Sequence, residues 1–419
     1  MKISKCVLCI VLCLAAPFLL LSCGEKTSSG GENVPGSLEN PNISFFLWSE
    51  PSAEAKASYE AFEKKYGGKV TYEVTTWDEL EGKIVTANAA GKGPDIVYAN
   101  EQSFIKYALN SIIKPIDGLI DLSNEKWDPI SQQLVWKGKH YVPVPKGTAN
   151  EKLVYFNQTM FEAAGVKTPL EYFEEGDWTF ANFEKCAREM TADTNGDGKT
   201  DQWGWASWQM HVFMYANGGK SVTIGEDGSV SVTLEEKNTM DGLQFLKDGY
   251  SKYGYIKPDG NTTWQTAFPQ GEVAMMTENV FPAWGYMGDM KDEWDIVPFP
   301  VGPGNTEKKN IVSAGGNCLS FTTKNEAGAI AYLELQNEHT ISIEQNQIKK
   351  VFSEAQQKRI KEARENSLLV SFEQNFGFWE RTQWQLLFEV TNPETAVSAT
   401  VQKWKPVLQS NINTALGLE

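Results

Sequence analysis

Short apolar runs that alternate with helix-like segments constrain this fold more than any other feature of the sequence. Residues 43–48 (ISFFLW) are almost continuously apolar, which is typical of a strand buried on both faces of a parallel sheet. Residues 53–66 follow with apolar side chains at helical spacing. The pattern then gives a strand at 69–75, a helix at 77–90 and a strand at 94–98. Strands joined by helical crossovers predict a parallel α/β sheet.

A second α/β unit begins near residues 153–157 (LVYFN). Its apolar periodicity predicts helices at 178–191, 211–217 and 235–253, strands at 273–276 and 295–298, a strand-like segment at 311–322, a helix at 326–336 and further helices to the end. A chain of 419 residues with 41% hydrophobic residues is too long for one core and too apolar to be disordered. We therefore expect a globular protein of at least two domains.

The charge and the metal-binding side chains exclude several function classes. There are 38 Lys and Arg residues against 54 Asp and Glu, a formal net charge of −16, which argues against a nucleic acid partner. Three histidines (His140, His211 and His339) and two cysteines after residue 23 are too few for a zinc finger or an iron–sulfur cluster. Cys186 and Cys318 lie in apolar segments, so we expect buried thiols rather than a disulfide.

The amino terminus has the pattern of an export signal. Two lysines precede an apolar run over residues 6–22, which is shorter than the roughly 20 residues of a membrane-spanning helix. The run ends in LLSC (20–23), which resembles the bacterial lipobox. We predict a lipoprotein signal peptide over 1–22, a lipidated Cys23 and a flexible tether over 23–42, so that the protein is anchored to the outer face of the cell membrane. An uncleaved anchor is the alternative.

One loop has the spacing of a calcium-binding site. Residues 193–201 (DTNGDGKTD) match the first half of a calcium loop, with a glycine at the sixth position for the turn. The candidate ligands are Asp193, Asn195, Asp197, Lys199 through its backbone carbonyl, and Asp201. Gly204 stands where a closing glutamate belongs, so an Asx-rich turn without an ion is the alternative. A bound calcium would be structural, and no other cofactor is expected.

Several segments together carry a resemblance to a known family. They are AAGKGPDIV (89–97), GKHYVPVP (138–145), LVYFNQTMFEAAGVKTP (153–169), WTFANFEKCAREMTADTNGDGKTDQWGW (178–205), FPQGEVAMM (268–276), DIVPFPVGPG (295–304) and SAGGNCLSF (313–321). In this order and spacing the chain resembles the extracellular solute-binding proteins of carbohydrate ABC importers, of which maltodextrin-binding proteins are the best-known members. The resemblance covers nearly all of residues 43–419.

The resemblance implies a class II periplasmic-binding-protein fold, in which two α/β lobes enclose a ligand cleft. The N-terminal lobe would take residues 43–148 with 311–350, and the C-terminal lobe residues 149–310 with 351–419. It also implies a function. The protein would be a monomeric, substrate-binding lipoprotein that captures an extracellular sugar between closing lobes and delivers it to the permease subunits of an ABC importer.

The resemblance also implies aromatic platforms for the sugar. A sugar ring has an apolar face and a rim of hydroxyls, so its binding sites combine flat aromatic side chains with planar polar ones. Alignment with the family places such platforms at Trp208, at Trp284 or in another register Phe281, and at Trp379. The family's tryptophan of the first lobe is replaced by Ala99, and its acidic interlobe residue aligns with Asn150, which argues against maltodextrin itself.

Loops at strand ends supply the remaining candidates. In parallel α/β sheets ligands bind beyond the carboxyl ends of the strands. The candidates there are Trp48 and Glu50 after the first strand, Asn100 and Glu101 after the third, and Gly316 and Asn317, whose backbone can approach a ligand closely.

Two other function classes remain open alternatives. A secreted glycoside hydrolase would use two carboxylates beside the sugar, and these cannot be located among 54 acidic residues. No serine-hydrolase, zinc-protease, P-loop or dinucleotide motif is present. An adhesion protein would be a β-sandwich, unlike this alternation of strands and helices. The extent of the family resemblance along the chain favours a binding protein over an enzyme.

Overall fold

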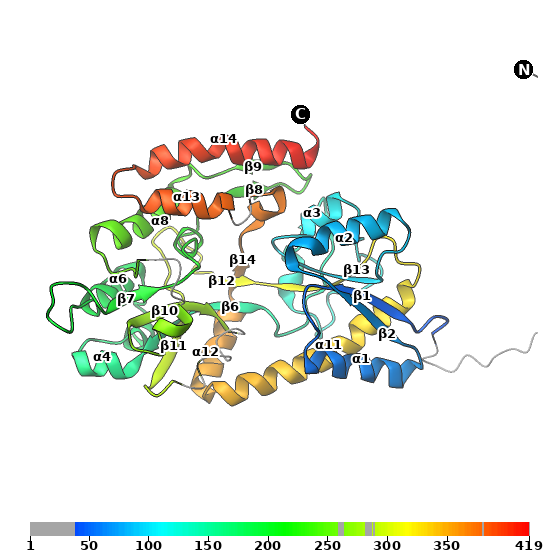
Figure 1. Ribbon diagram of the computed structural model, residues 1–419, viewed down its shortest axis with the longest axis horizontal. Coiled ribbons are helices and arrows are strands. Elements are labelled where there is room, and N and C mark those ends of the chain that lie inside the picture. Colours follow the sequence, from blue (N-terminus) through cyan, green and yellow to red (C-terminus); the bar gives the residue numbers. More distant parts are fainter. Residues whose placement is uncertain (1–37, 259–263, 281–286, 288–289, 379–380, 419) are drawn as a thin grey trace, which may run out of the picture. The chain divides into compact units, whose positions relative to one another are not determined.

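The computed structural model describes residues 38–258, 264–280, 287, 290–378 and 381–418 (Figure 1). The predicted signal peptide, Cys23 and most of the predicted tether lie outside the described residues. No helix in the described part of the chain is both long enough and apolar enough to cross a membrane.

The first strands form the parallel sheet that the apolar pattern predicts. The sheet has four strands in the order β13-β3-β1-β2. Its elements are β1 (Ile43–Leu47), β2 (Val70–Val74), β3 (Ile96–Asn100) and β13 (Gly315–Leu319), with the crossover helices α1 (Ala53–Tyr66) and α2 (Trp77–Ala89). β1 pairs in parallel with both β2 and β3, while β13 adds antiparallel to β3. The parallel core is confirmed, and β13 is an addition that local sequence does not reveal.

Local signals set both ends of α1. The Ser52 hydroxyl accepts a hydrogen bond from the Ala55 amide at 3.2 Å and caps the amino terminus. Gly67 ends the helix with a φ of 76°, which favours glycine. Between these ends Phe62 is fully buried against Tyr332 of α11 (Glu326–Val351), with ring centroids 5.5 Å apart. The apolar face of α1 therefore packs against α11.

A six-stranded sheet is built around β6 (Asn150–Asn157). β6 pairs antiparallel with three strands, namely β10 (Val273–Asn279), β11 (Trp294–Pro298) and β12 (Asn310–Ser313). β7 (Trp203–Ala206) pairs with β10, and β14 (Ser367–Leu369) pairs with β12, both in parallel. The prediction of a second α/β unit is confirmed in its main strands.

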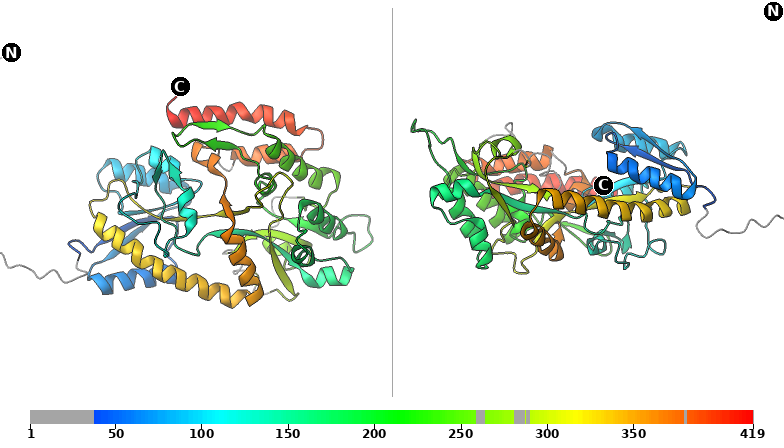
Figure 2. Two further views of the ribbon diagram at one scale, coloured as in Figure 1. Left: turned by 180° about the vertical axis from the view of Figure 1, so that it is seen from behind. Right: turned by 90° about the horizontal axis from the view of Figure 1, so that it is seen from below.

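The remaining elements cover and connect these sheets. The helices are α3 (Phe104–Leu109), α4 (Gln158–Ala164), α5 (Pro169–Glu174), α6 (Phe180–Glu189), α7 (Val212–Ala216), α8 (Lys237–Lys247), α9 (Trp264–Ala267), α12 (Glu354–Glu365), α13 (Arg381–Thr391) and α14 (Val397–Leu416), with the single turns η1 (Pro129–Gln133), η2 (Asp248–Lys252) and η4 (Phe372–Phe376). Two hairpins pair β4 (Val135–Trp136) with β5 (Lys139–His140), and β8 (Val222–Ile224) with β9 (Val230–Val232). Figure 2 shows α14 beside α13 and the β8–β9 hairpin.

One predicted helix ends much later than expected. The pattern predicts a helix over 326–336, whereas α11 continues to Val351. The extra residues are strongly polar, yet they contain neither glycine nor proline. Without a residue that breaks the backbone hydrogen bonding, the helix continues beyond its apolar stripe.

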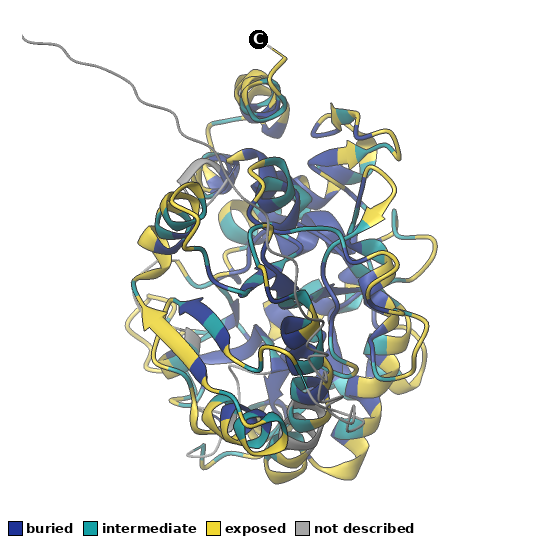
Figure 3. Ribbon diagram, turned by 90° about the vertical axis from the view of Figure 1, so that its right-hand side faces the viewer, coloured by how far each residue is buried: buried dark blue, intermediate teal, exposed yellow. Residues whose placement is uncertain are grey.

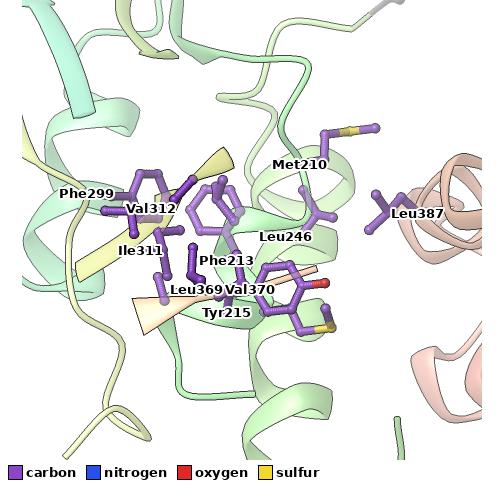
Figure 4. Packing of buried hydrophobic residues seen from close by; sticks show 14 of the residues in the cluster. Met210, Phe213, Tyr215, Leu246, Phe299, Ile311, Val312, Leu369, Val370 and Leu387 are labelled. Carbon is purple, nitrogen blue, oxygen red and sulfur yellow. The ribbon is translucent and has the colours of Figure 1, made fainter. Parts of the chain in front are cut away.

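The core of the six-stranded sheet is rich in aromatic rings. The Phe213 ring centroid lies 5.3 Å from that of Phe299 and 5.0 Å from that of Trp205. In Figure 4, Ile311 of β12 and Leu369 of β14 lie beside this group. Figure 3 shows that buried residues concentrate in the interior, while exposed residues lie on the outer faces of the helices and on the edge strand β2.

Ala314 connects the two sheets. It is the single residue between β12, in the six-stranded sheet, and β13, in the four-stranded sheet. Glu101, which directly follows β3, bonds to both sides of it. Its amide donates to the Ala314 carbonyl at 3.2 Å, and its carboxyl Oε2 accepts from the Ala314 amide at 3.0 Å. The carboxyl end of β3 is therefore fixed at the crossing point.

The predicted calcium loop forms a turn through its own hydrogen bonds. The Asp193 carboxylate accepts from the amides of Gly196 and Gly198, both at 2.7 Å, and Gly198 has a φ of 87°. These bonds account for the turn without an ion. In the described part of the chain, no group of three or more His, Cys, Asp or Glu side chains is arranged to hold a metal ion. Calcium at this loop stays a prediction.

Cys186 and Cys318 are both buried free thiols. Burial raises the pKa of Cys186 to about 12, which keeps its thiol protonated and unreactive.

Trp178 is a core side chain whose removal should destabilise the protein. Its indole is buried and donates to the Pro298 carbonyl at 2.9 Å. We predict that Trp178→Ala lowers the free energy of unfolding by about 3–5 kcal/mol, because it leaves a cavity and an unpaired carbonyl. Denaturant unfolding measures this. Trp178→Phe should recover part of the loss, and an unchanged unfolding midpoint would contradict the core assignment.

Candidate functional site

A cavity of about 550 Å³ lies at the carboxyl end of β3, next to the Ala314 crossing point. Both sheets contribute to its wall. The lining residues are Tyr98, Asn100, Glu101, Gln102, Pro145, Thr148, Asn150, Lys152, Trp208, His211, Asn279, Ser313, Ala314, Gly315, Gly316, Asn317, Gln336, Gln374, Gln383, Trp384 and Leu387. The location agrees with the rule that ligands bind beyond the carboxyl ends of parallel strands.

Carboxamide side chains dominate this wall. Eight of the lining residues carry one, and they are Asn100, Gln102, Asn150, Asn279, Asn317, Gln336, Gln374 and Gln383. A carboxamide offers two donors and an acceptor in one plane and has no charge. A ligand hydroxyl also donates and accepts, so a ring of amides fits a neutral polyhydroxyl compound better than it fits an ion.

Hydrogen bonds within the protein hold several of these amides in place. Asn317 Nδ2 donates to Gln336 Oε1 at 2.7 Å. Gln374 Nε2 donates to Gln383 Oε1 at 3.3 Å, and Gln383 Nε2 donates to the buried carboxyl of Glu373 at 3.1 Å. A wall that is fixed before the ligand arrives loses less conformational entropy on binding.

Aromatic rings supply the apolar part of the wall. Trp208 is 38% exposed, although most tryptophan side chains with described burial are better covered. Trp384 and Tyr98 are half-buried and also line the cavity. The missing side chain of Gly315 makes room for Tyr98, because a Cβ there would lie 2.4 Å from the Tyr98 hydroxyl.

The cavity brings together six of the predicted ligand-binding residues, namely Asn100, Glu101, Asn150, Trp208, Gly316 and Asn317. Trp48 and Glu50 are exposed and do not line it. Trp284 and Trp379, as well as the alternative Phe281, lie outside the described residues.

The structure explains the glycine at position 316 by packing rather than by the close approach of a ligand. A Cβ at this position would lie 2.4 Å from the Pro143 carbonyl oxygen. The absent side chain is therefore required where β13 packs against the chain before β6, and close approach of a ligand is not needed to explain it.

Sequence reasoning missed several lining residues, above all Lys152 and Trp384. Lys152 had a signal, because it is a charged residue at the start of the apolar run of β6. Trp384 precedes Phe388 by four residues, and their ring centroids lie 5.7 Å apart. That aromatic pair on a helix could have been noticed. Gln336, Gln374 and Gln383 carry no local signal, since surface helices are rich in glutamine.

Comparison with known families decides the identity of the fold. Residues 48–335 match the sequence model of the bacterial extracellular solute-binding proteins. The chain belongs to this family. The predicted resemblance is therefore confirmed. The proteins of this family are extracellular.

Curated relatives of this solute-binding protein are distant. A binding protein of Brucella abortus (strain 2308) is 25% identical over 268 residues, which cover 60% of this chain and 59% of the relative. The maltotriose-binding protein of Pyrococcus abyssi is 23% identical over 226 residues, which cover 53% of this chain and 45% of the relative. The chain thus spans less than two thirds of the length of these relatives.

Solved structures confirm the predicted fold class. An ABC substrate-binding protein from Listeria monocytogenes, in complex with cycloalternan, has a TM-score of 0.69 at 18% identity and covers 90% of this chain and 100% of its own. The maltose/maltodextrin-binding domain of Bdellovibrio bacteriovorus, bound to maltotriose, has a TM-score of 0.65 at 18% identity and covers 89% and 100%. UgpB of Mycobacterium tuberculosis, in complex with glycerophosphocholine, has a TM-score of 0.68 at 16% identity and covers 90% and 99%.

Two charged groups are buried in the cavity of this solute-binding protein. Burial lowers the pKa of Lys152 to about 8, and its ammonium donates to the oxygens of Asn279 and Ser313, each at 3.3 Å. Burial raises the pKa of Glu101 to about 7, and its Oε1 has no hydrogen-bond partner among the described residues. Attraction between the two groups partly offsets the cost of burying them.

Burial also shifts the pKa values of two neighbouring groups, Glu373 and His211, so that their neutral forms are favoured. Burial, together with the nearby charge of Glu101, raises the pKa of Glu373 to about 7. Burial lowers the pKa of His211 to about 3, so this imidazole is neutral at physiological pH. His211 packs its ring against Trp208, with centroids 6.4 Å apart, which suits a supporting role beneath that platform.

Burial of Glu101 should make the stability of the protein depend on pH. Its pKa in the folded protein is about 7 against an ordinary 4.5, so the folded state holds this proton more tightly than the unfolded state. The stability that results is fully present below the ordinary pKa and is lost as the pH rises through about 7. We predict that Glu101→Gln, which mimics the protonated acid, has a higher melting temperature than wild type at about pH 8 and a similar one at about pH 4.

The comparison reports on Glu101 together with Lys152 and Glu373, because the Glu101 carboxylate raises the pKa values of both. His211 shifts stability in the opposite direction between its folded pKa of about 3 and its ordinary 6.5, but it is present in both proteins. Thermal unfolding across this pH range is the measurement. Parallel curves for the variant and wild type would contradict the predicted linkage.

Proposed function

We propose that this protein is the substrate-binding lipoprotein of an ABC importer, and that its cavity captures an extracellular sugar or oligosaccharide. The observation that supports this best is the combination of eight carboxamides with the exposed ring of Trp208 in one cavity. Amides match the hydroxyl rim of a sugar, and an aromatic face matches its apolar C–H face.

The arrangement of the wall supports a closing mechanism. Tyr98 and Asn317 lie on strands of the four-stranded sheet, whereas Asn150 and Asn279 lie on strands of the six-stranded sheet. A sugar held by both groups would stabilise the arrangement that brings them together. Binding energy would then select a closed form that a permease recognises.

The relatives favour a carbohydrate but leave its identity open. A curated relative is named for maltotriose, and two similar structures were solved with cycloalternan and maltotriose. Another similar structure holds glycerophosphocholine, so the fold by itself does not fix the ligand. In this chain the carboxamide side chains around the cavity favour a neutral sugar as the ligand.

A secreted glycoside hydrolase is the alternative function. Such an enzyme places two carboxyl groups on either side of the sugar. Among the described residues that line the cavity, Glu101 is the single carboxyl, and the family's members are binding proteins. Incubation of the protein with oligosaccharides separates the two functions. A binding protein raises its melting temperature and leaves the sugar intact, whereas a hydrolase releases shorter products.

The test of the proposed function is a thermal-shift screen with glucose, galactose, xylose and their α- and β-linked oligosaccharides. The protein should be stabilised by at least one member, because a ligand that binds only the folded state shifts unfolding by mass action. No stabilisation by any member would contradict a carbohydrate ligand.

Trp208 should carry much of the affinity. Stacking on its ring removes an apolar sugar face from water, whereas a hydroxyl contact largely exchanges one hydrogen bond for another. We predict that Trp208→Ala weakens binding of the best sugar by about 30-fold or more, which corresponds to about 2 kcal/mol. Calorimetric titration measures this, and Trp404→Ala, at a buried helix position, is the control that should lower stability instead. Wild-type affinity in Trp208→Ala would show that the platform is misassigned.

Lipidation at Cys23 should hold the protein at the membrane. A diacylated cysteine supplies two acyl chains, which is enough for stable anchoring. We predict that Cys23→Ser moves the protein from the membrane fraction to the soluble fraction, with Cys186→Ser as a control that stays at the membrane. Detection by immunoblot after cell fractionation decides it, and membrane retention of Cys23→Ser would rule out this anchor.

A further inference from the structure

The aromatic wall of the cavity continues outward from Tyr98. The Trp48 ring centroid lies 5.2 Å from that of Tyr98, and the Trp77 ring centroid lies 5.3 Å from that of Trp48. Tyr98 lines the cavity, but the two tryptophans do not. Three aromatic rings therefore form a continuous row that leads from the cavity to the surface.

The strand order explains this row. The neighbouring parallel strands are β3, β1 and β2, in that order. Tyr98 lies in β3, Trp48 directly follows β1, and Trp77 begins α2, three residues after β2. Side chains at the carboxyl ends of neighbouring parallel strands gather at one edge of the sheet, which is the edge that faces the cavity.

Both tryptophans leave much of their surface in water. Trp48 is 37% exposed and Trp77 is 44% exposed, whereas tryptophans of the core such as Trp205 are fully covered. The planes of Trp48 and Trp77 meet at 90°, so an edge of one ring contacts the face of the other. Exposed apolar surface that is continuous with a binding cavity marks an extension of that site.

We propose that Trp48 and Trp77 form an outer binding site for sugar residues of an oligosaccharide that extends out of the cavity. The inference rests on the proposed function and adds to it that the ligand is longer than the cavity alone would hold. It gives the exposed Trp48, which the cavity leaves out, a role together with Trp77, which sequence reasoning did not select.

A permease surface would be the other occupant of this row. A stable protein interface buries about 800 Å² on each partner and involves about 20–30 residues of each. The row consists of two exposed rings that connect to the cavity through a third. Such a narrow path fits a single saccharide chain better than it fits a protein.

The ring planes also suggest the shape of the chain. Tyr98 and Trp48 are inclined at 57°, and Trp48 and Trp77 at 90°, so the rings do not form one flat platform. A chain that stacks on all three must bend. Linear α-1,4-linked glucans curve, whereas β-1,4-linked glucans are straight and flat, so the two series test different shapes of ligand.

The experiment titrates purified wild type and Trp77→Ala calorimetrically with maltooligosaccharides, from maltose to maltoheptaose, and with the matching cellooligosaccharides. We expect wild-type affinity to rise with chain length in the series that the cavity accepts, and the inclined rings fit the curved maltooligosaccharides better than the straight series. Trp77→Ala should bind the shortest sugars as wild type does and the longest about tenfold more weakly, because only long chains reach the outer ring. Trp77→Phe should recover most of the loss.

Phe321→Ala is the matched control. Phe321 is an aromatic residue with 52% exposure in the turn just after β13, at the end that pairs with the beginning of β3, and it does not line the cavity. This variant should bind every sugar as wild type does. The indole N–H resonance of Trp77 in the wild-type protein gives a second readout, which should shift with long sugars and not with short ones.

Each other outcome has a definite meaning. Equal weakening of short and long sugars in Trp77→Ala would overturn the outer site, since Trp77 would then act on the cavity itself. If Trp77→Ala binds sugars of every length as wild type does, the outer site is overturned. If cells that carry this variant also lose sugar uptake, the row of rings belongs to the contact with the permease. If wild type binds neither series but another sugar of the screen, the outer site fails while the proposed function stands. If nothing in the screen binds, both fail.

Discussion

Two hydrogen bonds between Glu101 and Ala314 fix the point on which the site depends. Ala314 is the residue at which the chain passes from the six-stranded sheet into the four-stranded sheet, and Glu101 bonds to both its amide and its carbonyl. A third hydrogen bond holds Glu101, because Asn375 Nδ2 donates to the Glu101 carbonyl at 2.7 Å. The ends of strands from two sheets therefore meet at a defined place, and the cavity lies there.

Burying ionisable side chains at this junction costs free energy, and the polar groups that reduce this cost also line the cavity. Glu101, Lys152 and Glu373 are all buried, and burial shifts the pKa of each toward the neutral form. A buried charge is tolerated when polar groups surround it, and here those groups are Asn279, Ser313 and the amides of the wall. The polar groups that stabilise the junction are thus also the groups that would meet the hydroxyls of the proposed sugar.

The aromatic rings divide into two populations with different tasks. Rings such as Phe213, Phe299 and Trp205 contact one another within the core and fix the shape of the six-stranded sheet. Trp208 is open to the cavity, and Trp48 with Trp77 is open to the surface beside it. Composition alone shows 14 tryptophans and cannot separate these groups, because burial depends on neighbours that are distant in sequence.

The sequence by itself determined the local elements and much of the N-terminal sheet. Periodic apolar residues, the Ser52 cap and Gly67 gave α1 with its observed bounds, and strand-like runs gave β1 to β3, because these features depend on neighbours within a few residues. Family resemblance added Trp208 and Asn150 to the candidate site, and the position of a loop added Asn317. Only the tertiary structure decided that Gln336, Gln374, Gln383 and Trp384 face the same cavity, that Gly316 serves packing, and that Trp77 continues a row from Tyr98. These contacts form between strands and helices that are far apart in the sequence, and a local pattern of residues does not show which distant segments will contact each other.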